Sequence, residues 1–89
     1  MISQEIEIQN KLGLHARAAS KFVSVAKEFS CRIEVASPFA TADGKSIMKM
    51  LLLQASLGTT IEITTDGDDE SAAMEALTEL INNKFDEEE

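Results

Sequence analysis

Residues 13–17 read Gly-Leu-His-Ala-Arg, and at this point the chain changes from the pattern of a strand to the pattern of a helix. Before them, isoleucines at positions 2, 6 and 8 lie among polar residues at the odd positions, as in a strand with one face in water. After them, apolar residues recur at spacings of three and four as far as Phe29, which predicts a helix over 16–29. His15, the only histidine, therefore lies at or beside the N-cap of this helix.

The start of the predicted helix is suited to an anion. The first backbone N–H groups of a helix, here including that of Ala16, lack partners inside the helix, and the macrodipole places about half a positive charge there. Arg17 adds a planar guanidinium with several donors. A nucleophilic imidazole beside these groups could accept a phosphoryl group and hold it covalently for a time. The residues alone leave open that His15 is an ordinary cap or surface residue.

The composition excludes several classes of protein. The 89 residues are expected to form one domain, 1–89. A net charge of −8, without tyrosine or tryptophan, opposes nucleic-acid binding. The single Cys31, expected in the core, cannot form an internal disulfide or complete a CxxC or zinc motif. Because the N-terminus does not read as a signal peptide and no apolar run approaches ~20 residues, we expect a cytoplasmic protein without membrane insertion.

Charge is unevenly distributed along the chain. Most acidic residues belong to the C-terminal third, and residues 86–89 form an acidic tail that we expect to be frayed, because four like charges repel. Arg17, Lys21 and Lys27 all belong to the first predicted helix. A basic helix face on an acidic protein indicates a docking surface for an acidic partner, although a merely solvated helix face would show the same pattern.

The remaining chain completes an α+β fold. Strands are predicted over 31–35, 39–43 and 59–65, and helices over 47–53, with Ser46 as its N-cap, and from about 70 to 84. The resulting order is βαββαβα. Strands with one apolar face need cover, and three helices on one face provide it. The sequence therefore predicts a two-layer open-faced β-sandwich with a four-stranded antiparallel sheet.

The stretch Gly13-Leu14-His15-Ala16-Arg17-Ala18-Ala19 closely resembles the active-site motif of the histidine-containing phosphocarrier proteins, HPr and NPr, of the bacterial phosphotransferase system. The likeness covers nearly the whole chain, including residues 45–48 and 58–59. It implies the same open-faced fold, with His15 accepting a phosphoryl group on Nδ1 from enzyme I and passing it to enzyme IIA proteins, while Arg17 stabilises that group. It implies a monomeric carrier rather than an enzyme, with no cofactor and no metal. Ala18 departs from the motif, which has proline there.

The same resemblance implies a docking surface on the first two helices. Its residues would be Ser20, Ser24, Lys27, Ile47, Met48, Lys49 and Leu51. Met48 is the most informative, because methionine adapts to several partner surfaces, whereas Ile47 or Leu51 could be ordinary core. Ser46 matches a serine that an HPr kinase/phosphorylase modifies in some members, although its role as a cap needs no such explanation.

Another class of protein stays open at this point. The order βαββαβ also occurs in small-ligand-binding regulatory modules and in ferredoxin-like metal chaperones. A chaperone is excluded by the lack of CxxC, but a regulatory module would simply leave His15 unphosphorylated. Residues 83–87 faintly resemble the NPr type, so the sequence does not decide between sugar transport and nitrogen-linked regulation.

Overall fold

Four strands form a single antiparallel sheet in the computed structural model, which describes residues 1–87. They are β1 (Ile2–Glu7), β2 (Arg32–Ala36), β3 (Thr41–Asp43) and β4 (Thr60–Asp66), in the spatial order β1-β4-β2-β3. Each adjacent pair is antiparallel. The long β4 lies between β1 and β2, so the two strands nearest the middle of the sheet come from distant parts of the chain.

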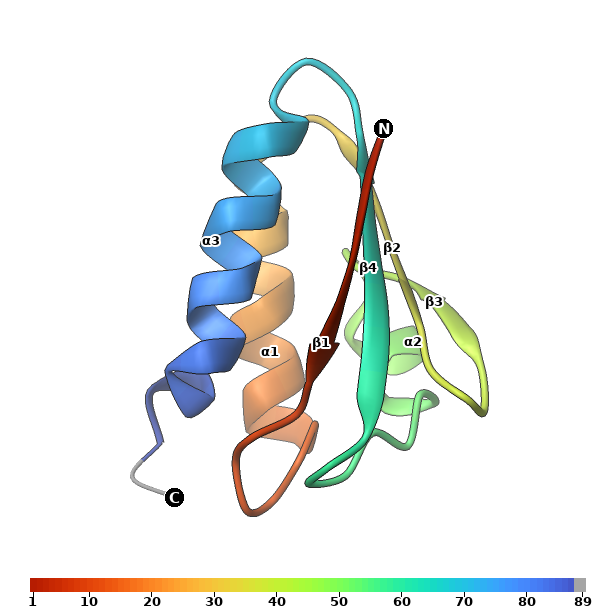
Figure 1. The fold of residues 1–89 in the computed structure, drawn as a ribbon, viewed down its shortest axis with the longest axis vertical. Coiled ribbons are helices and arrows are strands. Elements are labelled where there is room, and N and C mark those ends of the chain that lie inside the picture. Colours follow the sequence, from red (N-terminus) through yellow and green to blue (C-terminus); the bar gives the residue numbers. More distant parts are fainter. Residues whose placement is uncertain (88–89) are drawn as a thin grey trace.

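The helices cover one face of this sheet, as Figure 1 shows from the edge of the sheet. They are α1 (Ala16–Ala26), α2 (Ile47–Leu51) and α3 (Glu70–Asn82), and a short 3₁₀ turn, η1 (Lys84–Asp86), follows α3. α1 and α3 pack against each other, and α2 packs between α1 and β3. The predicted two-layer α+β fold with three helices on one face is confirmed.

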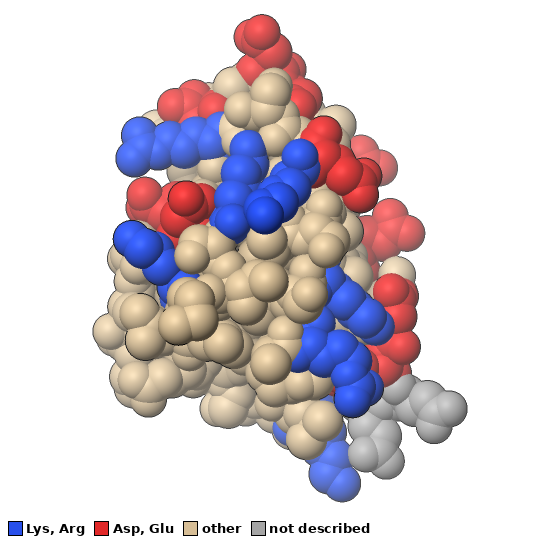
Figure 2. All heavy atoms as spheres, turned by 180° about the vertical axis from the view of Figure 1, so that it is seen from behind, with Lys and Arg blue, Asp and Glu red and all other residues tan. Residues whose placement is uncertain are grey.

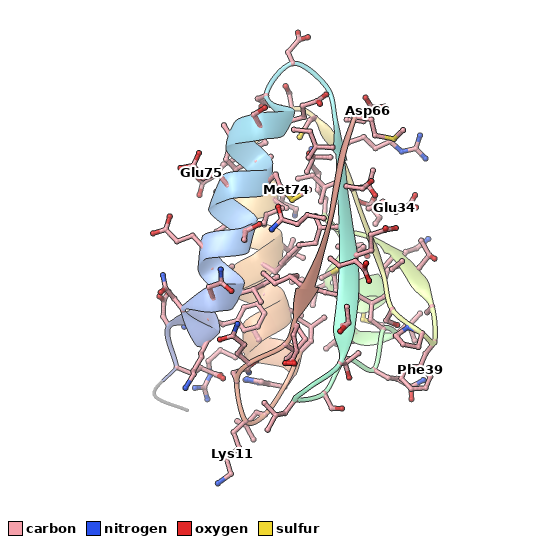
Figure 3. All side chains as sticks on the ribbon, viewed as in Figure 1. Lys11, Glu34, Phe39, Asp66, Met74 and Glu75 are labelled. Carbon is pink, nitrogen blue, oxygen red and sulfur yellow. The ribbon has the colours of Figure 1, made fainter. Side chains whose placement is uncertain are left out.

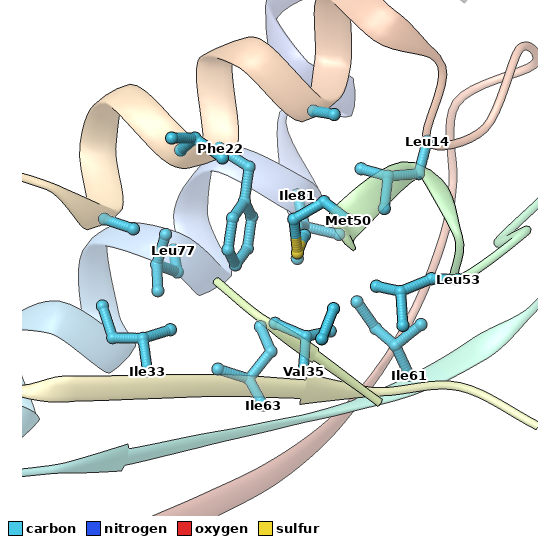
Figure 4. Close-up of a cluster of buried hydrophobic side chains, with 14 of the residues drawn as sticks. Leu14, Phe22, Ile33, Val35, Met50, Leu53, Ile61, Ile63, Leu77 and Ile81 are labelled. Carbon is cyan, nitrogen blue, oxygen red and sulfur yellow. The ribbon is translucent and has the colours of Figure 1, made fainter. Parts of the chain in front are cut away.

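The core lies between the two layers (Figure 4). The register places Ile6 opposite Ile61 and Ile63 opposite Val35, so that the apolar side chains of three strands share one face. Phe22 of α1 and Leu77 of α3 cover them and are fully buried. The opposite face of the sheet carries exposed polar side chains such as Glu5, Glu34 and Glu62, and Figure 3 shows Glu34 and Asp66 pointing away from the helices. The alternation read from the sequence thus follows the burial in the structure.

Three predicted elements are shorter in the structure than expected. α1 ends at Ala26 because the next turn uses tighter hydrogen bonds, from the Phe29 N–H to the Ala26 carbonyl for example. α2 ends in the same way, since the Leu53 N–H donates to the Met50 carbonyl. β3 begins only at Thr41, because the Ser37 hydroxyl accepts hydrogen bonds from the backbone of residues 39 and 40 and holds them in a turn.

The expectation of a frayed tail is wrong for Asp86 and Glu87. Three consecutive residues, 84–86, adopt left-handed backbone angles with φ of 57°, 55° and 63°, which turn the chain back toward α1. Phe85 in the middle of this turn is fully buried, and its carbonyl accepts a 2.7 Å hydrogen bond from Nζ of Lys21. Burying one aromatic side chain opposes the repulsion between the acidic residues. Residues 88 and 89 of the expected tail lie outside the described residues.

Candidate functional site

The loop before α1 is held by a close backbone contact with the loop after α2. Gly13 has φ of +67°, and a Cβ atom there would lie only 2.6 Å from the Ala55 carbonyl oxygen and 2.7 Å from Cα of Ser56. Only glycine fits both this conformation and this space. The Leu14 N–H donates to the same Ala55 carbonyl at 2.7 Å, and the Leu14 side chain is buried. These contacts determine where the next residue, His15, enters the helix.

His15 is the N-cap residue of α1, as the sequence predicted. Its backbone is extended (φ −85°, ψ −178°), and its carbonyl accepts the first intrahelical hydrogen bond, from the Ala19 N–H at 2.8 Å. Its side chain makes no capping hydrogen bond. The imidazole therefore accepts no hydrogen bond from the N–H groups of the first turn, among them that of Ala16. The imidazole side chain is 26% exposed, which leaves it open to a partner from one side.

The first turn of α1 carries positive charge only. It contains no acidic residue, and Arg17 lies on its exposed surface. The guanidinium therefore adds to the partial positive charge of the helix start. An anion attached to His15 would find N–H donors and a cation within the same turn.

Glu87 is the partner of His15 that the sequence did not reveal. Oε2 of its carboxylate lies 2.5 Å from Nε2 of His15, and Oε1 accepts a 2.8 Å hydrogen bond from Nδ2 of Asn10. The Asn10 amide also donates to the Gly13 carbonyl at 2.8 Å, so it links the tail to the loop before α1. No spacing rule joins His15 to Glu87, which lies 72 residues away, so sequence reasoning missed Glu87 and, with it, the role of Asn10.

Glu87 is shielded from solvent, with 12% of its side chain exposed. Burial acts to raise the pKa of its carboxyl group, but the hydrogen bonds from Asn10 and His15 and the charges of His15 and Arg17 outweigh that effect. The pKa of Glu87 is therefore held below its ordinary value, and the group is a carboxylate at neutral pH.

The predicted docking residues lie on the surface of α1 and α2 or directly follow α1. Ser20, Ser24 and Lys27 of α1 and Lys49 of α2 are exposed. Met48 is 76% exposed, whereas Met50 and Leu53 are fully buried and hold α2 against the core. Ile47 and Leu51 are at the lower end of the exposed range, at 40% and 36%, so neither is ordinary core. Figure 2 shows that basic side chains flank a broad uncharged area on this side of the molecule.

Three further leucines are exposed as well. They are Leu12, Leu52 and Leu57. Leu12 precedes the loop that holds His15, and Leu57 follows the segment that packs against that loop. Leu12 and Leu57 are single leucines in turns and carry no periodic signal, whereas Leu52 belongs to the apolar run 47–53, in which the sequence did not show which side chains reach solvent.

Ser46 caps α2, as predicted. Its hydroxyl oxygen accepts a 3.3 Å hydrogen bond from the Lys49 N–H. The cap precedes Ile47 and Met48 directly, so any group added to Ser46 would lie at the border of the apolar surface.

Two negative findings concern residues 1–87. No helix among them is both long and apolar enough to span a membrane. No group of three or more His, Cys, Asp or Glu side chains within the same residues is placed to hold a metal ion.

The chain matches a known family model and curated proteins over almost its full length. The model described as the PTS HPr component phosphorylation site matches residues 2–83. Phosphocarrier protein HPr of Pseudomonas putida is 54% identical over 88 residues, which cover 98% of each chain. Phosphocarrier protein NPr of Shewanella violacea is 38% identical over 86 residues, covering 97% of this chain and 94% of its own.

Solved structures agree with these matches. The structure of HPr-C-His from Thermoanaerobacter tengcongensis superimposes with a TM-score of 0.95 at 44% identity, with both chains fully covered. A structure described as an HPr dimer from the same organism has a TM-score of 0.78 at 44% identity and covers 98% of this chain and all of its own.

Proposed function

The chain belongs to the HPr family of phosphocarrier proteins of the phosphotransferase system, and from this premise we propose that it carries a phosphoryl group on His15 from enzyme I to enzyme IIA proteins. The observation that carries the proposal is an accessible imidazole at the N-cap of α1, whose side chain makes no capping hydrogen bond. It acts as a covalent intermediate between enzymes, and we propose that it does so as a monomer in the cytoplasm.

The chemistry needs no metal. The lone pair on Nδ1 of His15 attacks phosphorus, a P–N bond forms, and the bond from phosphorus to the donor breaks with its electron pair leaving on the donor. The N–H groups at the start of α1 and the guanidinium of Arg17 stabilise the negative oxygens of the transferred group. Because these donors lie on the surface, they stabilise the group without enclosing it, and the next acceptor can reach it.

The direct test is phosphorylation of the intact chain. We expect enzyme I and phosphoenolpyruvate to add one phosphoryl group, seen by mass spectrometry, and the adduct to be labile in acid and stable in alkali, as a phosphohistidine is. Parallel reactions with sugar-branch and nitrogen-branch enzyme I will show which branch the chain serves. A regulatory module that only binds a small ligand would remain unmodified in both reactions.

Arg17→Ala should slow transfer through His15 by about tenfold or more, since a hydrogen bond to a charged group contributes ~1.5–3 kcal/mol. The melting temperature should change little, because the residue is exposed and fills no core volume. Lysine at position 17 should restore the rate only in part, because it lacks the planar fork. Arg32→Ala is the matched control, an exposed arginine in β2. If Arg17→Ala transferred the phosphoryl group at the native rate, the proposed electrostatic role of Arg17 would be wrong.

We further propose that the exposed apolar residues of α2, with the basic residues around them, form the docking surface for acidic partners. The surface combines Ile47, Met48 and Leu51 with the cations Lys27 and Lys49. Ser20 and Ser24 of α1 continue it. A protein with a net charge of −8 that presents cations here offers local complementarity to an acidic partner despite overall repulsion.

Met48→Glu should weaken enzyme I binding by roughly tenfold or more, because a charge in the centre of an apolar interface loses its water. The melting temperature should stay near that of the native chain, since the side chain is already 76% exposed. Ala72→Glu is the control with the same added charge, on an exposed position of α3. α3 begins at the opposite end of the molecule from the start of α1 (Figure 1). A binding titration and a thermal melt distinguish the two effects; equal affinities for Met48→Glu and Ala72→Glu would contradict the docking proposal.

We propose that Ser46 is also a regulatory phosphorylation site, for an HPr kinase/phosphorylase. Ser46→Asp should keep or raise the melting temperature, because aspartate can cap the same N–H group and its charge opposes the helix dipole. It should nevertheless slow phosphorylation of His15 by enzyme I, with a defect that shrinks at high salt. Ser46→Asn, a cap without charge, is the control. Equal initial rates for the two variants at low ionic strength would leave Ser46 as a cap alone.

A further inference from the structure

We propose that Asn10 and Glu87 are positioning residues that hold the imidazole of His15 in the tautomer with its proton on Nε2, leaving the lone pair of Nδ1 free to attack phosphorus. The inference rests on the proposed phosphocarrier function and adds two residues that the active-site motif does not contain. It gives Glu87, a residue of the acidic tail, a role in the reaction at His15.

The first step of the argument is the direction of the hydrogen bond between His15 and Glu87. Glu87 Oε2 lies 2.5 Å from Nε2 of His15, so the two atoms share a proton. Hydrogen bonds from Asn10 and His15 outweigh the effect of burial and keep the pKa of Glu87 below its ordinary value, so the carboxylate has no proton to give. A carboxylate only accepts, and Nε2 must therefore be the donor. In a neutral ring with its proton on Nε2, Nδ1 carries the lone pair.

The second step is the placement of the carboxylate. Asn10 is fully buried, and its amide group donates both to Oε1 of Glu87 and to the Gly13 carbonyl, each at 2.8 Å. The loop that positions His15 thus also holds the group that orients its ring. Nδ2 of Asn10 donates two hydrogen bonds, whereas Oδ1 of the same buried side chain has no hydrogen-bond partner among the described residues. Leaving a buried acceptor unpaired is costly, which indicates that the orientation of the Asn10 amide serves its two donated bonds.

The third step is the anchoring of the tail. The left-handed turn over 84–86 brings Glu87 across the start of α1, and the buried Phe85 fixes that turn. Nζ of Lys21, one helical turn after Arg17, donates to the Phe85 carbonyl at 2.7 Å. Left-handed angles at three successive non-glycine residues are costly, so packing and hydrogen bonds must maintain them. The carboxylate of Glu87 is therefore held both by the amide of Asn10 and by the anchored turn over 84–86.

The fourth step is the effect on the reaction. As the P–N bond forms on Nδ1 and the donor's bond to phosphorus breaks, the ring gains positive charge while its proton stays on Nε2. The carboxylate of Glu87 stabilises that charge, as the aspartate does for the histidine of a Ser-His-Asp triad. Arg17 and the N–H groups at the start of α1 belong to the same turn and can stabilise the phosphoryl oxygens, so the ring and the phosphoryl group of the adduct each have a partner of opposite charge.

The test uses the intact chain and the variant Glu87→Gln. Because His15 is the only histidine, a proton–nitrogen correlation spectrum of the ¹⁵N-labelled protein shows one imidazole and reports its tautomer directly. In the native chain, at a pH where the ring is neutral, we expect the proton on Nε2. In Glu87→Gln the amide can donate as well as accept, so we expect a measurable population with the proton on Nδ1 and phosphorylation by enzyme I slower by roughly tenfold.

Asp86→Asn is the matched control. It removes the same charge at the adjacent position, Asp86 is exposed, and asparagine tolerates the φ of 63° found there. We expect its tautomer, rate and melting temperature to equal those of the native chain. A thermal melt of Glu87→Gln excludes general loss of structure.

Each outcome decides the inference. Equal or faster phosphorylation of Glu87→Gln than of Asp86→Asn would overturn it, and so would a slower rate with an unchanged tautomer, which would give Glu87 a role other than positioning. A native spectrum with the proton on Nδ1 would overturn it without any kinetics. If the native chain were not phosphorylated at all, the proposed function itself would fail, whereas the spectrum would still report the contact between His15 and Glu87.

Discussion

His15→Ala should abolish phosphorylation by enzyme I and phosphoenolpyruvate while leaving the domain folded. The alanine variant has no nucleophile at the start of α1, and no other histidine exists to replace it. The fold should survive because His15 makes no capping hydrogen bond with its side chain and lies outside the core. We expect no adduct by mass spectrometry and a melting temperature close to native, with any change reflecting the lost contact to Glu87.

The matched control for this prediction is Asn83→Ala, a change of an exposed polar residue just after α3 that should leave both labelling and stability as they are. A phosphoryl adduct in folded His15→Ala would place the acceptor elsewhere in the chain. Such a result would overturn the assignment of the site without touching the family membership.

Phe22→Ala should lower the free energy of unfolding by about 3–5 kcal/mol, the usual cost of truncating a buried phenylalanine. Phe22 is fully buried, and Figure 4 shows its ring between α1 and the sheet, near Leu77 and Met50. Because small domains have total stabilities of only about 5–15 kcal/mol, this single change removes a large share. Chemical denaturation monitored by far-UV circular dichroism gives the free energy directly.

Phe39→Ala is the control of identical chemistry, since Phe39 is 63% exposed in the turn before β3. We expect its effect to stay within about 0.5 kcal/mol. If both phenylalanines cost the same, the core would not lie between α1 and the sheet as described.

Most of the fold could be predicted from local patterns. Period-two alternation in β1, β2 and β4 and the spacing of three and four in α1 and α3 identified the elements and their inner faces. The ends of α1, α2 and β3 were predicted too long, because tight turns and the hydroxyl of Ser37 compete there with regular hydrogen bonds. Such competition depends on geometry that residue type alone does not specify.

The candidate site also combines features that the sequence shows locally with features that depend on tertiary packing. His15, Arg17 and the cap Ser46 could be read from the sequence, because a helix start is a local feature with its own residue preferences. The apolar run of 47–53 left open which side chains reach solvent. The packing of α2 against α1 and β3 decides this, by burying Met50 and Leu53 and exposing Met48 and Leu52.

The sequence by itself determined the order of the elements, their apolar faces and the place of His15 at a helix start, because each of these depends on neighbours within a few residues. Only the tertiary structure decided that Asn10 and Glu87 meet at His15. The contact between His15 and Glu87 joins residues 72 positions apart and requires a left-handed turn at 84–86, a conformation that Lys84 and Phe85 do not favour. Burial of Phe85 offsets both the strain of that turn and the repulsion between the acidic residues. Phe85 can be buried only when α1 and α3 have packed on the sheet, and this is why the tertiary structure decides the contact.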